Sequence, residues 1–252
     1  ALQSDIARAV AREIQVKLTP NEAARLSRVH TVDPEVHQVY LKGRFFWAKF
    51  TPDSLEKSLG HFQEAIKKDP SYAPAYAGLA DVYNIITYFT ASAPGDVTPK
   101  AKSAATKALE LDETLGDAHT AMGWIKGNYD WDWLAAEKQF NRAVELSPGS
   151  SNVLFWYSCY LTLMERYEEA IRGAKRALEL DPLSILARMN LGRILMFARH
   201  YDEGLERLRE TVEMNPSYLF AWALIGIIYT FKGMYEEAIG ALQKATPRSG
   251  EG

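Results

Sequence analysis

Apolar positions along this chain recur at the spacing of amphipathic helices, and the order in which they appear returns after a fixed interval. Residues 167–182 read YEEAIRGAKRALELDP, residues 201–216 read YDEGLERLRETVEMNP, and the stretch from Tyr235 reads YEEAIGALQKATP. The tyrosines that begin these segments recur with a period of 34. A fixed period of this length indicates a protein built from stacked copies of one small unit.

Each unit is predicted to contain two helices. In the copy at 185–218, Leu191 and Leu195 lie one helical turn apart, and a second helical stripe follows. Pro216 is predicted to end the second helix, because proline has no N–H to donate and its ring clashes with the preceding turn. Small Gly192 is predicted to lie where the two helices approach each other closely.

The same template extends backwards along the chain, with insertions, to give six helix–turn–helix repeats. Their predicted bounds are about 36–72, 73–115, 116–150, 151–184, 185–218 and 219–246. The second repeat carries the segment TYFTASAPGDVTPK, which is predicted to be a long turn. Trp131 and Trp133 fall in the turn of the third repeat, where they either cover the helix ends or form a contact site.

The segments at both ends of the array have their own predictions. Residues 1–35 are predicted to form N-terminal capping helices, since their apolar residues make one helical stripe, and residues 247–252 to be a disordered tail. The stripe consists of Ile6, Val10, Ile14 and Leu18. A terminal repeat normally needs a polar covering helix, so the sixth repeat is predicted to expose an apolar flank that allows homo-oligomers to form.

A period of 34 with this pattern resembles the tetratricopeptide repeat. The resemblance implies an all-α fold, a right-handed superhelix in which the first helix of each repeat lines a concave groove. It places these groove residues in the last three repeats: Phe155, Cys159, Leu163, Met189, Arg193, Met196, Phe197, Phe220, Ile227 and Phe231. Aromatic and Met side chains in a groove suit an apolar peptide or an amphipathic helix. The alternative is that these side chains pack against neighbouring helices.

The groove positions of the first three repeats are more polar than those of the last three. They include Arg44, Asp81, Asn84, Asp117, Thr120 and Asn128. The Lys and Asn positions with which chaperone-binding members of the family clamp a C-terminal carboxylate have no counterpart in this sequence.

Composition excludes several other classes of protein. The net charge of −3 gives no basic surplus for binding nucleic acid, and no apolar run is long enough for a membrane span. The five histidines are scattered, without the spacing of a zinc site, so no metal, cofactor or catalytic residue is predicted. The single cysteine excludes an internal disulfide framework. Both a cytoplasmic and a periplasmic location therefore remain open.

The sequence of the chain resembles that of one group of repeat proteins in particular. The segments QSDIARAVAREIQVKL, YLKGRFFW, DPSYAPAYAGLADVY, YDWDWLAAEKQFNRAVELSPG, ALELDPLS and FARHYDEGLERL occur in this order. Together they look like the C-terminal repeat region of large bacterial regulatory proteins, in which it follows a TolB-like segment and a winged-helix domain, a Ser/Thr kinase or a nucleotide cyclase. The resemblance implies a non-enzymatic scaffold that binds a protein segment, and the alternative is a self-association module that holds an attached effector domain.

Overall fold

The computed structural model describes residues 33–90 and 93–246, in which the chain forms twelve α-helices and no strand. The helices are α3 (Pro34–Trp47), α4 (Pro52–Lys68), α5 (Ala73–Ile86), α6 (Pro94–Leu111), α7 (Gly116–Asn128), α8 (Trp133–Leu146), α9 (Ser151–Leu163), α10 (Tyr167–Leu180), α11 (Ile185–Phe197), α12 (Tyr201–Met214), α13 (Leu219–Phe231) and α14 (Tyr235–Ala245). The prediction of an all-α solenoid is confirmed. Most of the predicted capping segment, up to residue 32, and the tail at 247–252 lie outside the described residues.

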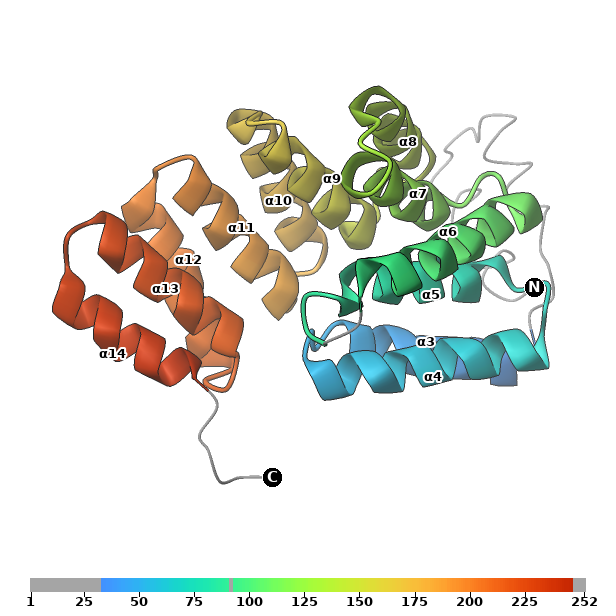
Figure 1. The fold of residues 1–252 in the computed structure, drawn as a ribbon, viewed down its shortest axis with the longest axis horizontal. Coiled ribbons are helices and arrows are strands. Elements are labelled where there is room, and N and C mark those ends of the chain that lie inside the picture. Colours follow the sequence, from blue (N-terminus) through green and yellow to red (C-terminus); the bar gives the residue numbers. More distant parts are fainter. Residues whose placement is uncertain (1–32, 91–92, 247–252) are drawn as a thin grey trace, which may run out of the picture.

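The helices form six pairs that follow one another around an arc, from α3 and α4 to α13 and α14 (Figure 1). Each helix packs most extensively against the other helix of its pair. The first helices of successive pairs also contact one another, whereas within the described chain no second helix contacts another second helix. The first helices therefore lie on the inner, concave side of the arc, and the second helices lie on its outer side.

The turn inside each of the last three pairs has one repeated geometry. Glu165, Arg199 and Gly233 lie at the same position of successive repeats, and all three have a positive φ, of 56°, 63° and 73°. The amide of the next residue then donates to a carbonyl in the last turn of the preceding helix, as Arg166 N does to Leu161 O at 2.9 Å. This is the Schellman motif, in which a left-handed residue ends a helix and satisfies its free carbonyls.

The third pair uses the same geometry with one additional residue. Trp131, which lies one repeat period before Glu165, also has a positive φ, of 55°. Its turn spans four residues between α7 and α8, where the next turn spans three. Trp131 is largely exposed, with its ring edge-on to Trp133 at a centroid distance of 5.8 Å. Trp133 starts α8 in the position that Tyr167 has in α10.

Glycine allows the two helices of a pair to approach closely. A Cβ atom on Gly192 of α11 would lie 2.7 Å from Cγ of Leu208 and 3.2 Å from the carbonyl oxygen of Gly204, both in α12. Leu208 is fully buried, so it has little room to move. The glycine predicted from the sequence to set the helix separation therefore does so through direct contact.

The insertion in the second repeat is not a turn throughout. The segment TYFTASAPGDVTPK was predicted as one long turn, but α6 begins at Pro94, and the second half of the insertion is helical. Proline suits this first helical position, because its fixed φ matches a helix and its missing N–H has no partner there. The insertion therefore lengthens α6 to 18 residues and leaves a shorter turn after α5.

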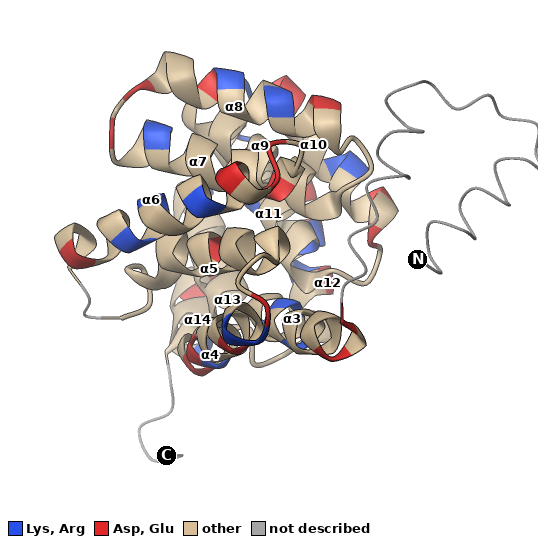
Figure 2. Ribbon diagram, turned by 90° about the vertical axis from the view of Figure 1, so that its right-hand side faces the viewer, with Lys and Arg blue, Asp and Glu red and all other residues tan. Residues whose placement is uncertain are grey.

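Charged residues of both signs cover the outer helices. Figure 2 shows Lys and Arg mixed with Asp and Glu along α6 and α8. None of the described helices is long and apolar enough to cross a membrane.

We predict that replacing Gly192 with Ala destabilises the protein by about 1–3 kcal/mol, because the added methyl group overpacks the contact with Leu208. Gly60→Ala is the matched control. Gly60 lies within α4 with open space around it, so alanine should stabilise that helix by about 0.5–1 kcal/mol. Urea unfolding followed by circular dichroism measures both changes, and equal effects of the two substitutions would contradict the packing argument.

We predict that Arg199→Gly stabilises the protein by about 1 kcal/mol, since glycine adopts the left-handed conformation without the steric cost of a side chain. Gly233→Ala, at the equivalent position of the next repeat, should destabilise by a similar amount. The same unfolding measurement tests this pair, and a destabilising Arg199→Gly substitution would show that the arginine side chain contributes more than the strain costs.

Candidate functional site

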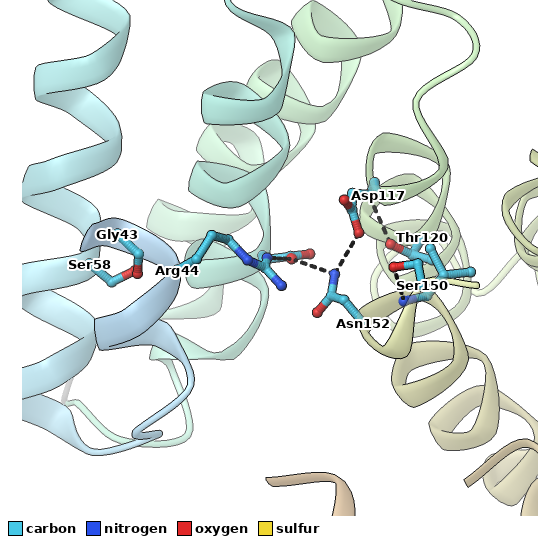
Figure 3. A network of polar contacts seen from close by, with 9 residues as sticks. Gly43, Arg44, Ser58, Asp117, Thr120, Ser150 and Asn152 are labelled. Atoms are coloured by element: carbon cyan, nitrogen blue, oxygen red, sulfur yellow. Dashed lines mark hydrogen bonds and ion pairs between the residues drawn. The ribbon is translucent and has the colours of Figure 1, made fainter. Parts of the chain in front are cut away.

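A network of polar side chains closes the concave side of the first four repeats. The guanidinium of Arg44 donates from Nη1 to Oδ2 of Asp81 at 3.2 Å. The side-chain amide of Asn152 donates to Oδ1 of Asp117 at 2.7 Å and to Oδ2 of Asp81 at 3.4 Å. The four residues come from four different first helices, α3, α5, α7 and α9. Figure 3 shows Arg44, Asp117 and Asn152 pointing toward one another from three of them. The network therefore connects the first repeat to the fourth.

The central carboxylate of this network is fully buried. Burial raises the pKa of Asp81 from 3.8 to about 7, although the neighbouring Arg44 charge lowers it. A perturbed carboxylate in an accessible cleft would be a candidate for acid–base catalysis. Asp81 is instead inaccessible and bonded to Arg44 and Asn152, so its geometry is that of a structural tie.

Aromatic side chains fill the space beside this network. Trp47 of α3 lies edge-on to Phe155 of α9, with ring centroids 6.1 Å apart. The rings of Trp156 and Trp124 also pack together, with centroids 4.8 Å apart. The guanidinium of Arg44 lies over the Trp47 ring at 4.8 Å. Side chains of the first and fourth repeats thus meet across the concave side. In this half of the molecule, side chains of the chain itself therefore fill the concave side.

The ten residues predicted to line the groove divide into two sets. Phe155, Cys159, Met189 and Met196 are buried among neighbouring helices, and Arg193 is partly buried. The remaining five are exposed: Leu163, Phe197, Phe220, Ile227 and Phe231. We call these five residues together with Arg193 the C-terminal apolar surface.

Arg193 is held in place by a chain of polar contacts. Its Nη2 atom donates to Oδ1 of Asn190 at 2.7 Å and to Sγ of Cys159 at 3.3 Å. Burial raises the pKa of the Cys159 thiol, so the thiol stays protonated at neutral pH and is a poor nucleophile. The Arg193 guanidinium lies 5.9 Å from the ring centre of Phe197, which places a fixed positive charge beside the exposed apolar side chains.

Three members of the C-terminal apolar surface occupy the same position in successive repeats. Leu163, Phe197 and Phe231 each lie one repeat period apart and are 44%, 47% and 60% exposed. Phe231 also stacks on Tyr201, with ring centroids 5.8 Å apart. The equivalent position in the second repeat is Ile85, which is buried. The repeated row of apolar side chains is therefore confined to the open half of the array.

Sequence reasoning missed one residue near this surface. Tyr88, in the turn after α5, is largely exposed. The net pKa of its hydroxyl is raised, chiefly by partial loss of hydration, and the positive charge of Arg193 opposes this rise. The signal in the sequence is an aromatic pair within a turn insertion, TYFT, but the period alone does not show that this turn reaches the fifth repeat.

The described residues offer no site for a metal ion. No three His, Cys, Asp or Glu side chains among them are close enough to hold one.

We predict that Asp81 makes the stability of the protein depend on pH. Between its unfolded pKa near 3.8 and its folded pKa of about 7, the folded state binds more protons than the unfolded state, so stability falls as pH rises through this window. Asp81→Asn removes the titration and keeps an oxygen that can accept from Arg44. The free energy of unfolding of the wild type, minus that of the Asn variant, should fall between about pH 4 and about pH 7. A difference independent of pH would contradict this.

Known proteins resemble this chain in both sequence and fold. Residues 189–252 match the tetratricopeptide repeat family. The transcriptional regulator HilA of Salmonella paratyphi A is 27% identical over 161 residues, which cover 64% of this chain and 29% of HilA. The putative adenylate cyclase 3 of Rhizobium meliloti is 26% identical over 132 residues, 50% of this chain and 22% of the cyclase. The chain thus spans less than a third of either relative.

A solved structure extends the likeness of fold to nearly the whole chain. A monomeric mutant of IFIT1 with Gppp-AAAA superposes with a TM-score of 0.69 at 14% identity, covering 97% of this chain and 55% of that one. At this identity the likeness concerns the fold alone. The fixed sequence period and the six helix pairs give this chain the helical-repeat architecture of tetratricopeptide proteins, and residues 189–252 match that family in sequence as well.

Proposed function

We propose that the protein is a non-catalytic scaffold that binds a peptide or helical segment of a partner protein on the C-terminal apolar surface. The observation that carries the proposal is the row of Leu163, Phe197 and Phe231, three exposed apolar side chains at one position of successive repeats. Contiguous exposed apolar side chains on a soluble protein commonly mark an interaction site. Phe220 and Ile227 extend the row across α13.

The chemistry of this surface defines the segment that it would bind. Apolar side chains repeated at the spacing of the array fit the apolar face of an extended or helical segment. Arg193, which is fixed by Asn190, supplies a positive charge that an acidic residue of the segment would pair with. The closed N-terminal half, in which Trp47 meets Phe155, would hold the open half in shape for this binding.

The relatives support a place for this scaffold in a larger regulatory protein. One is named a transcriptional regulator and the other a putative adenylate cyclase, and each matches over only part of its length. A repeat array attached to an effector domain would bring that effector to a partner protein. We therefore propose that the full protein belongs to bacterial signalling or transcriptional regulation.

The test is binding of defined peptides. Peptides selected from a random display library on the wild-type protein should be apolar with an acidic residue. They should lose at least about 2 kcal/mol of binding free energy when both Phe197 and Phe231 become Ser, as expected for central anchors. Fluorescence anisotropy with a labelled peptide measures this loss.

The matched control is Leu134→Ser, which removes an equally exposed apolar side chain from α8 on the outer side of the array. The control should bind the selected peptides as the wild type does. If the Phe197 and Phe231 double variant retains full affinity while remaining folded by circular dichroism, the C-terminal apolar surface is not the binding site.

A further inference from the structure

The contact between the last two repeats shows which positions one repeat presents to the next. In the last repeat, Leu224 and Ile228 of α13 are 4% and 0% exposed, because the preceding pair covers them. The first repeat can be aligned with the last through Gly43 and Gly226, which both face the second helix of their own pair. The residues of α3 equivalent to Leu224 and Ile228 are then Leu41 and Phe45. Leu41 and Phe45 are 51% and 59% exposed, so no segment within residues 33–90 and 93–246 covers this half of a repeat–repeat contact on α3.

The other half of the same contact lies open at the opposite end. Leu205 and Leu208 of α12 are 4% and 0% exposed beneath the next repeat. Their equivalents in the following repeat, Ile239 and Leu242 of α14, are 57% and 41% exposed. Within the described residues, no helix packs over this face of α14.

Charge at the two ends is also complementary. Lys232, just after α13, forms an ion pair with Asp202 in the first turn of α12. The equivalent of Lys232 at the α3 end is Lys49, and the equivalent of Asp202 at the α14 end is Glu236. Both Lys49 and Glu236 are exposed, and the Lys49 ammonium lies 4.5 Å from the centre of the Phe45 ring, so it belongs to the α3 face itself. The ion pair that joins the last two repeats therefore has its counterparts at α3 and α14.

The end faces share one departure from the internal pattern, and α3 has a second one, because exposed Lys42 stands where α13 has buried Ile225. The internal contact has apolar Ala221 in α13 and Val212 in α12, both buried. At the free ends these positions are Gln38 of α3 and Thr246 after α14, which are both polar and exposed. A polar residue on one face is thus matched by a polar residue on the other.

We infer that a second copy of this chain docks head-to-tail, with its α3 face seated on the α14 face of the first copy, as α13 is seated on α12 within one copy. The apolar core of the contact is formed by Leu41 and Phe45 on one side and Ile239 and Leu242 on the other, and Lys49 pairs with Glu236. Such a contact joins two different surfaces, so each added copy presents a new free end. Effector domains attached to successive copies would then be held in a row.

A mixing experiment tests this arrangement. Phe45→Glu blocks the α3 face, and Ile239→Glu blocks the α14 face, each by placing a charge in the apolar contact. Sedimentation velocity should show wild-type species that grow with protein concentration, and each variant alone should be monomeric. Equal amounts of the two variants should form a dimer and nothing larger, because only one pair of intact faces remains.

Other outcomes overturn the inference. A wild type that stays monomeric at every concentration excludes self-association and is the result expected if residues 1–32 or another partner occupies the α3 face. Dimers of Phe45→Glu alone would mean that α14 faces pair with each other. Circular dichroism and thermal melting confirm that each variant is folded, so that loss of association is not loss of structure.

A charge exchange provides an independent check. Glu236→Lys alone should weaken association about tenfold, because the new positive charge lies against Lys49. Adding Lys49→Glu should restore association, because the two residues then carry opposite charges again. If the double variant associates no better than Glu236→Lys alone, these two residues do not meet.

Discussion

The fold depends on the fact that no helix pair can cover its own apolar surface. Within a pair, the approach at Gly192 brings Leu208 against the first helix, but the faces of both helices that point along the array toward the next repeat stay apolar. The next pair covers them, as Leu205 and Leu208 are covered by the repeat that begins at Leu219. Stability is therefore shared between neighbours along the array, as in other solenoids, and the two ends necessarily differ from the middle.

The sequence period predicts the structural features that arise within one repeat or between adjacent repeats. It located the helix pairs, the close approach at Gly192 and the end of the second helix before Pro216. It did not predict the helical second half of the insertion before Lys100, since the turn residues Pro94 and Gly95 are also compatible with a first helical turn.

Contacts between distant repeats could not be predicted in the same way. Arg44 and Asn152 lie in the first and fourth repeats, and both contact Asp81. The period places all three on the concave side, but only the curvature of the array brings them together. The same curvature buries Phe155 beneath Trp47, so a residue at a groove position became part of the interior. Position within a repeat therefore indicates the side on which a residue lies, without indicating whether a partner can reach it.

The tie through Asp81 also makes the two halves of the array different. Direct side-chain contacts connect α3, α5, α7 and α9, whereas the first helices of the last two repeats, α11 and α13, meet least. A ligand that contacts both Phe197 and Phe231 would therefore bridge the least extensive contact between neighbouring first helices.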